Sequence, residues 1–143
     1  GMTYMEHLQD NIKTYSPLDA LDEKELAFLE ETAELMQNYP TIPCNDCKYC
    51  MPCPYGIDIP AILLHYNKCV NAGEIATSSQ DEGYRKARRA YLVSGDRAVP
   101  KLRQADRCRG CNTCMARCPQ SINIPHEIHK IGAYIEKLRQ DKL

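Results

Sequence analysis

The sequence predicts an all-α fold built from two pseudo-symmetric units, each a cysteine-rich loop that leads into a helix. Apolar residues recur at intervals of three and four along several stretches, which is typical of helices with one buried face. No stretch alternates apolar and polar residues convincingly, and no Asn-Gly or Asp-Gly pair marks a β-hairpin. Two segments about 65 residues apart repeat one pattern of cysteines, prolines and isoleucines.

The chain divides into two predicted parts. Residues 1–40 form a helical lead-in, and residues 41–143 hold both cysteine-rich segments and the remaining helices. A length of 143 residues allows one domain with a modest core. Within the larger part, residues 73–81 are the best candidate for an internal linker, and residues 98–107 have no clear assignment.

Two capping-box spacings predict the helix starts of the lead-in. Thr3 and Glu6 precede a helix with apolar residues near one face. Asp22 and Glu25 repeat the spacing before a second helix, which continues to about Asn38.

Three further helices follow from periodicity and from stop signals. One covers residues 60–72, with Gly73 as its C-cap. Another covers roughly residues 80–93 and stops near Gly95. The last covers residues 125–140, where isoleucines and a leucine recur by threes and fours.

Eight of the nine cysteines lie in two short cassettes. They are Cys44, Cys47, Cys50 and Cys53 in the first cassette, and Cys108, Cys111, Cys114 and Cys118 in the second. Three cysteines spaced by two residues, then a fourth followed by proline, is the ligand pattern of a [4Fe–4S] cluster. Such spacing lets the chain curl so that successive sulfurs reach different irons, while backbone N–H groups point at the sulfides. Two cassettes therefore predict two [4Fe–4S] clusters and electron transfer.

Each cassette continues in the same way. Residues 53–60 and 118–125 share the pattern Cys-Pro-x-x-Ile-[Asp/Asn]-Ile-Pro. Pro60 and Pro125 suit the first turn of a helix, where a missing N–H costs nothing. We expect the isoleucines to cover the clusters and exclude water, which is one factor that sets a reduction potential.

The fourth cysteine of each cassette is assigned by the rule for two-cluster ferredoxins, in which it ligates the other cluster. Cluster one then takes Cys44, Cys47, Cys50 and Cys118, and cluster two takes Cys108, Cys111, Cys114 and Cys53. The first cassette departs from the usual run, because only Met51 and Pro52 precede its last cysteine. The spacing therefore does not decide whether Cys53 is a ligand. The alternatives are a cluster that lacks its fourth cysteine and a three-iron cluster.

Zinc is the main alternative for the cassettes, because paired Cys-x-x-Cys motifs also form Cys₄ zinc sites. The nearly contiguous cysteines and the Cys-Pro endings favour iron–sulfur over zinc. The ninth cysteine, Cys69, falls in a predicted helix. It is either a small packed hydrophobe or a spare ligand in place of Cys53.

Basic residues mark two possible contact surfaces. Lys48, Arg107, Arg109 and Arg117 interleave the cassettes, either as a solvated surface or as a guide for an acidic electron partner. The run of residues 85–89 is either the solvated face of a helix or a docking patch.

Several function classes lack a signal. The formal charge of −1 and the absence of a motif give no indication of nucleic-acid binding. The apolar run of residues 61–64 is too short to span a membrane. The N-terminus has no signal-peptide pattern, which predicts a cytoplasmic protein with reduced thiols. No catalytic residue is assigned, because no phosphate loop, nucleophile elbow or carboxylate pair is present.

Residues 42–60, with the ending Cys-Met-Pro-Cys-Pro, resemble the start of the C-terminal ferredoxin module of iron–sulfur aldo/keto reductase family proteins. The short gap before Cys53 is usual in that family. Residues 108–125 resemble the second cassette of the module, and residues 5–18 resemble the segment that leaves the reductase barrel.

The resemblance implies an α-helical ferredoxin fold with two [4Fe–4S] clusters, attached to a (β/α)₈ barrel with nicotinamide-dependent chemistry. The barrel's catalytic tetrad matches no motif here, so only cluster binding carries over, to the eight cassette cysteines. The implied partners are the barrel of the parent chain, with residues 1–40 as a residual linker, and an unidentified redox protein or cofactor. A free-standing helical ferredoxin subunit is the alternative.

Overall fold

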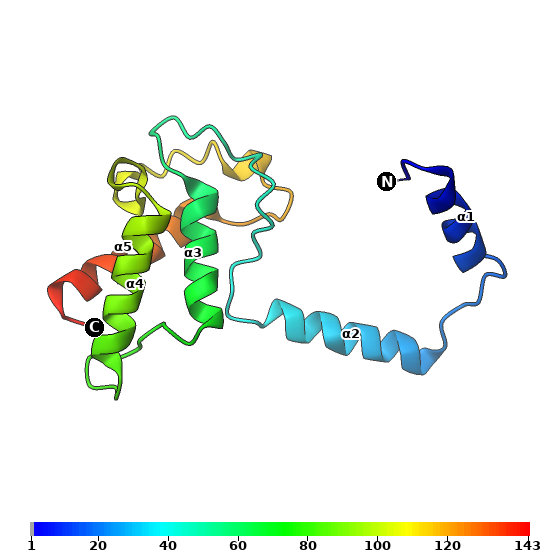
Figure 1. The fold of residues 1–143 in the computed structure, drawn as a ribbon, viewed down its shortest axis with the longest axis horizontal. Helices are drawn as coiled ribbons and strands as arrows, with labels where there is room; N and C mark the ends of the chain where they lie inside the picture. The colour runs from blue at the N-terminus through cyan, green and yellow to red at the C-terminus, as the bar shows by residue number, and fades with distance from the viewer. Residues whose placement is uncertain (1) are drawn as a thin grey trace. The chain divides into compact units, whose positions relative to one another are not determined.

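A computed structural model describes residues 2–143, and all the regular secondary structure in that range is helical. Five α-helices and three short 3₁₀ turns are present, and the described residues contain no strand. The predicted all-α class is confirmed. The chain divides into two units, Gly1–Tyr39 and Pro40–Leu143 (Figure 1).

The first unit consists of α1 (Met5–Thr14) and α2 (Glu23–Gln37), neither of which buries a side chain. Large apolar side chains are instead exposed to solvent: Phe28 is 66% exposed and Met36 is 74% exposed. The unit therefore has helices with apolar side chains but no core of its own.

The capping predictions for this unit had opposite outcomes. Asp22 caps α2: its carboxylate accepts hydrogen bonds from the backbone N–H groups of Lys24 and Glu25, at 2.8 and 2.9 Å. The Glu25 carboxylate accepts in return from the Asp22 N–H, which confirms the second capping box. The first was wrong, because Tyr4 is the N-cap of α1 and no side chain caps that helix.

The second unit packs three helices together (Figure 1). They are α3 (Ile59–Asn71), α4 (Tyr84–Ala98) and α5 (Ile124–Gln140). The 3₁₀ turns are η1 (Lys101–Arg103), η2 (Ala105–Arg107) and η3 (Met115–Arg117). Helix α3 contacts both α4 and α5, and η2 packs on α5.

Two groups of buried side chains form the core of this unit. The first group gathers around the cassettes and the N-terminal ends of α3 and α5, and it contains Ile42, Ile57, Ile59, Ile62, Leu63, Val99, Ala105, Ile122, Ile124, Ile128 and Ile131. The second group joins the other ends of the helices through Cys69, Ala76, Tyr84, Tyr91 and Leu138. The isoleucines that follow each cassette are thus buried, as expected.

Helix α4 differs most from its prediction. It begins four residues late, because the Asp81 carboxylate accepts hydrogen bonds from the N–H groups of Thr77 and Ser78 and holds residues 77–81 in a turn. It also continues through Gly95 to Ala98. A Cβ on Gly95 would lie 3.3 Å from His65 Cε1, so this glycine serves the close packing of α3 on α4.

The end of α3 follows its prediction. Gly73 has φ +66°, its N–H donates to the Val70 carbonyl at 3.1 Å, and the Glu74 N–H donates to the Cys69 carbonyl at 2.9 Å. This is the Schellman arrangement of helix C-termini. The unassigned residues 98–107 contain η1 and η2, and the Arg103 carbonyl there accepts from the Asp58 N–H at 3.1 Å.

Candidate metal centres

The two cassettes share an unusual backbone conformation. In each, the residues on either side of the second cysteine have positive φ: 56° and 63° at Asp46 and Lys48, 66° and 62° at Gly110 and Asn112. Left-handed residues at these places reverse the local curl of the chain. Successive N–H groups in such turns converge and form concavities that bind anions, including the sulfides of iron–sulfur clusters.

The match extends into the segments that follow. Gly56 and Ser121 have equivalent places in the repeat, and both have positive φ, 76° and 52°. The side chains of Asp58 and Asn123 then cap α3 and α5, each accepting from a backbone N–H at 3.3 Å. The predicted internal repeat is therefore present in the backbone geometry as well as in the sequence.

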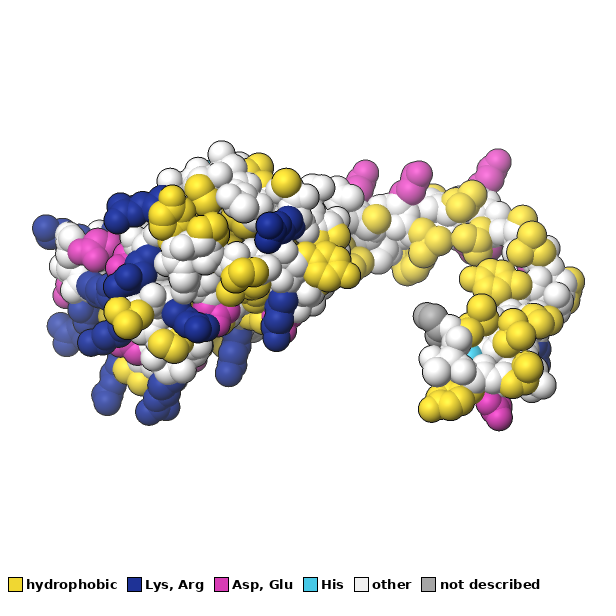
Figure 2. Space-filling model, turned by 90° about the horizontal axis from the view of Figure 1, so that it is seen from above, with side chains coloured by type: hydrophobic (Ala, Val, Ile, Leu, Met, Phe, Trp, Pro, Cys, Tyr) yellow, Lys and Arg dark blue, Asp and Glu magenta, His cyan; other side chains and the backbone are white. Residues whose placement is uncertain are grey.

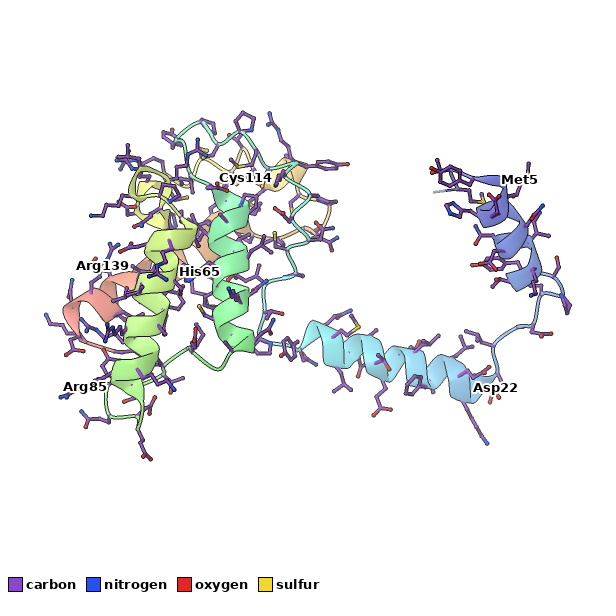
Figure 3. All side chains as sticks on the ribbon, in the orientation of Figure 1. Met5, Asp22, His65, Arg85, Cys114 and Arg139 are labelled. Carbon is purple, nitrogen blue, oxygen red and sulfur yellow. The ribbon has the colours of Figure 1, made fainter. Side chains whose placement is uncertain are left out.

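Two partly open cavities of nearly equal size lie between the cassettes, with volumes of ≈ 320 and ≈ 300 Å³ when the solvent at their mouths is included. Cys44, Cys47 and Cys50 line the larger together with Cys118 of the other cassette, and Cys108, Cys111 and Cys114 line the smaller together with Cys53. The structure thus brings the eight cysteines into the two crossed sets of four that the sequence predicts. Figure 3 shows Cys114 among the loops near the start of α3.

The apolar wall of each cavity also contains residues from both repeats. The first cavity is closed by Pro60 and Leu63 of α3 and by Ile122 from the other repeat. The second is closed by the equivalent residues, among them Ile128 of α5 and Ile57. Each repeat therefore contributes three cysteines and a helix end to one cavity, and its fourth cysteine and first isoleucine to the other.

Ile124 lines both cavities. It is 2% exposed and begins α5. One side chain thus forms a common wall, and the two cavities are neighbours.

Burial disfavours the thiolate form of three cassette cysteines, Cys44, Cys50 and Cys114. It raises the pKa of Cys44, where a hydrogen bond from the Asp46 backbone opposes the shift and the Asp46 carboxylate adds to it. It also raises the pKa of Cys50 to about 11. Burial also raises the pKa of Cys114. Because iron binds thiolate, cluster assembly at these cysteines must release protons and be opposed by acid.

The pKa of Cys111 is shifted in the opposite direction to those of Cys44, Cys50 and Cys114. The Thr113 hydroxyl lies 3.4 Å from its sulfur, and this hydrogen bond lowers the pKa of the exposed Cys111 thiol. The bond stabilises negative charge on that sulfur.

Each cavity meets solvent at the second cysteine of its cassette. Cys47 and Cys111 are exposed, and the other six cassette cysteines are half-buried. Lys48 lines the first cavity, with its amine 3.8 Å from the Asp46 carboxylate, and Arg109 lines the second. Neither Arg109 nor the exposed Arg107 and Arg117 forms an ion pair within residues 2–143.

This donor set fits a cluster better than a single ion. A zinc site needs four ligands that converge at about 2.0–2.3 Å on one point. No three His, Cys, Asp or Glu side chains in the described part of the chain converge closely enough to hold one metal ion. The sulfurs instead surround a cavity, as the separate irons of a cubane require, and its walls are largely apolar.

A comparison with protein families decides the identity of these centres. The 4Fe-4S dicluster domain family matches residues 43–124, which are more than half of the chain. The chain belongs to the 4Fe-4S dicluster domain family. Its cofactors are two [4Fe–4S] clusters, and the zinc alternative falls away. The matched region of this dicluster domain runs from the residue before Cys44 to Ile124, the wall shared by both cavities.

No curated protein and no solved structure matches the chain. Among residues 2–143, no helix has both the length and the apolar character needed to cross a membrane.

Cys69 does not line either cavity. It is 2% exposed in the second core, and its sulfur lies 3.5 Å from His65 Nε2, which in turn lies 2.9 Å from the Ser94 hydroxyl (Figure 3 shows His65 between α3 and α4). Burial raises the pKa of Cys69 and lowers that of His65, so both are held neutral. The cysteine packs in the second core here, whereas Cys53 lines the second cavity with the three cysteines of the other cassette.

The basic run of α4 is divided between two roles. Arg88 turns inward: its Nε donates to the Leu138 carbonyl and lies 3.5 Å from the Asp141 carboxylate, which ties α4 to the end of α5. Arg85 and Arg89 are exposed and line an open groove between α3 and α4. Figure 2 shows how densely Lys and Arg cover the second unit.

Sequence reasoning missed three features of the site. They are the paired positive φ angles, the hydroxyl of Thr113 on Cys111, and the shared wall at Ile124. Gly110, before the second cysteine, was a signal for the first, because glycine is the usual residue in the left-handed region. The other two depend on side-chain positions that spacing alone does not determine.

Proposed function

We propose that this dicluster domain is the electron-transfer module of a larger aldo/keto reductase-like oxidoreductase. It passes single electrons between an external donor or acceptor and a catalytic domain outside the present sequence. The observation that carries the electron-transfer role is the pair of crossed, four-cysteine cavities with a common wall at Ile124. Neighbouring redox centres separated by one side chain suit relay of electrons rather than storage of a structural metal.

The ligand sets of the proposal follow the two cavities. Cys44, Cys47, Cys50 and Cys118 would hold cluster one, and Cys108, Cys111, Cys114 and Cys53 would hold cluster two, because these sets line the two cavities. Each cluster supplies one-electron chemistry at a potential that its surroundings set. The protein's own residues do the rest. The left-handed turns would point backbone N–H groups at the sulfides of a bound cluster, and the buried isoleucines would exclude water from both centres.

Two observations support a larger parent protein. Residues 42–60 and 108–125 resemble the ferredoxin module of iron–sulfur aldo/keto reductases, including the two-residue gap before Cys53. In addition, α1 and α2 bury none of their side chains, although Leu26 and Leu29 follow one stripe of α2. An amphipathic helix is stabilised chiefly by packing its apolar face on something else. A barrel domain in the same polypeptide would provide that surface.

Single cysteine-to-serine variants test the ligand sets. EPR spectra of the reduced protein should change in pairs: Cys118→Ser should alter the same signal as Cys50→Ser, and Cys53→Ser the same signal as Cys114→Ser. Cys69→Ser is the matched control and should leave both signals unchanged, because Cys69 lies outside both cavities. Pairing within cassettes, with Cys118 grouped with Cys114, would exclude crossed ligation.

Two experiments test whether the domain belongs to a larger oxidoreductase. One reads the coding sequence upstream, and the other tests reduction of the clusters by a reduced nicotinamide cofactor. An in-frame barrel should be found there, and NADPH or NADH should reduce the clusters in the full polypeptide but not in residues 1–143. A stop codon and ribosome-binding site directly upstream would instead support a free-standing ferredoxin subunit.

A further inference from the structure

The two cluster cavities are related by an internal repeat, yet their polar surroundings differ. Thr113, between the second and third cysteines of its cassette, places its hydroxyl 3.4 Å from the Cys111 sulfur. Tyr49 has the equivalent place in the first cassette, is 66% exposed, and forms no hydrogen bond to a cassette sulfur in the described residues. Among the described residues, only the second cavity thus has a side-chain hydroxyl hydrogen-bonded to a cysteine sulfur. Once that sulfur binds iron and carries no proton, the hydroxyl is the donor.

Charge differs in the same direction. Each cavity is lined by one basic side chain, Lys48 or Arg109. Lys48 lies 3.8 Å from the Asp46 carboxylate, which offsets its charge, whereas no residue from 2 to 143 pairs with Arg109. Among the residues that line the cavities, the second therefore has a basic side chain without an ion-pair partner, and the first does not.

Both differences act on the reduced form of a cluster. Taking up one electron makes a cluster more negative by one charge, and the donor loses that electron. A hydroxyl that donates to a ligand sulfur and an unpaired guanidinium nearby both stabilise added negative charge. Hydrogen bonds to sulfur and net charge are among the factors that set cluster potentials.

We propose that cluster two has the higher reduction potential, set by Thr113 and Arg109, so that electrons run from cluster one to cluster two. The proposal deepens the proposed function and rests on its ligand sets. It assigns a direction to the relay: the first cassette is the entry side, and the exposed edge at Cys111 is the exit.

Potentiometric titration followed by EPR tests this on the cluster-loaded protein. Wild type should show two resolved one-electron waves. Thr113→Val should move the upper wave to lower potential and leave the lower wave in place, while Thr113→Ser, which keeps the hydroxyl, should behave as wild type. Tyr49→Thr should move only the lower wave, toward higher potential, if its hydroxyl reaches Cys47 as that of Thr113 reaches Cys111.

Arg109→Gln provides a second, electrostatic test. It should also lower the upper wave, and its effect should shrink as salt is raised, because exposed charges are screened over about 10 Å at 0.1 M ionic strength. The Thr113→Val shift should not depend on salt. A single unresolved wave in wild type, a Thr113→Val shift confined to the lower wave, or no shift in either variant at full iron content would overturn the proposal. Absence of iron and sulfide would instead refute the proposed function itself.

Discussion

Backbone strain at single residues positions the sulfur ligands. Asp46, Lys48 and Asn112 all hold positive φ although none is glycine. An L-residue in this region costs roughly 1–2 kcal/mol, less for Asn and Asp, whose side chains bond locally. Such strain persists only where the surroundings compensate for it, and such sites are often functional. Binding of a cluster to the cassettes would supply that compensation.

Replacing Gly110 by alanine should lower the free energy of unfolding by about 1 kcal/mol. The cost is conformational, since φ is +66° and an added Cβ would meet only His129 Cε1, at an ordinary 3.6 Å. Gly110→Asn is the matched control and should cost less, because Asn tolerates the left-handed region. Denaturant unfolding of the cluster-loaded protein measures both. Equal costs for the two variants would argue against a conformational origin.

Two tyrosines of the second core, the buried Tyr91 and the half-buried Tyr134, differ in how their hydroxyls are satisfied. Tyr91 is 1% exposed, and its hydroxyl has no hydrogen-bond partner among the described residues. The Tyr134 hydroxyl accepts from the Ala76 N–H at 3.0 Å and donates to the Ala76 carbonyl at 3.3 Å. Burying a hydroxyl without a partner costs about 1–3 kcal/mol. Tyr91→Phe should therefore raise the melting temperature, and Tyr134→Phe should lower it. A loss of stability in Tyr91→Phe would reveal a partner for that hydroxyl.

His65 should make stability depend on pH. Burial lowers its pKa below 6.5, the positive charge of Lys68 lowers it further, and Glu74 opposes the shift. The unfolded chain therefore binds the proton more readily. The stabilising contribution is complete above about pH 6.5 and is lost as pH falls below that value. Between about pH 7.5 and 5.5, wild type should lose more stability than His65→Gln, whose other titrating groups are the same. Parallel pH profiles would contradict this assignment.

At the scale of elements, helix starts depend on which side chain reaches the first free N–H groups. Asp22→Ala should remove the capping box of α2 and cost about 1 kcal/mol of local stability. Amide exchange at Lys24 and Glu25 should accelerate about fivefold as a result. Thr3→Ala, in the spacing that forms no cap, should leave exchange in α1 unchanged. A similar acceleration in both variants would mean that capping does not determine these starts.

Element boundaries were predictable where local chemistry determines them. Gly73 ends α3 because its positive φ permits the Schellman bonds, and Pro60 and Pro125 fit in the first turns of α3 and α5. Gly95 misled the prediction, because its role is to accommodate the His65 ring across the helix interface. Local sequence does not reveal that kind of tertiary contact.

At the scale of the whole molecule, cysteine spacing predicted both the crossed sets and their cofactors. Spacing alone did not decide whether Cys53 is a ligand, because its cassette is one residue shorter than the usual run. The structure places Cys53 in the second cavity and Cys69 in a separate core. The asymmetry between the cavities could not be predicted from the repeat, since it arises from Thr113 standing where the first cassette has Tyr49.

The proposed crossed ligation would also link folding to the metal. If each cluster is held by both cassettes, removal of iron disconnects the segments that bracket α3 and α4. The first core, which gathers around the cassettes, should then loosen together with the cavities. Stability and cofactor content should therefore change together.

The most direct test of the central claim is the iron and acid-labile sulfide content of anaerobically purified protein. Two [4Fe–4S] clusters predict about eight irons and about eight sulfides per chain, with EPR signals of two reduced centres. About four irons would leave one cavity without its cubane and would contradict the equivalence of the two cassettes. Zinc with no sulfide would contradict the iron–sulfur assignment altogether.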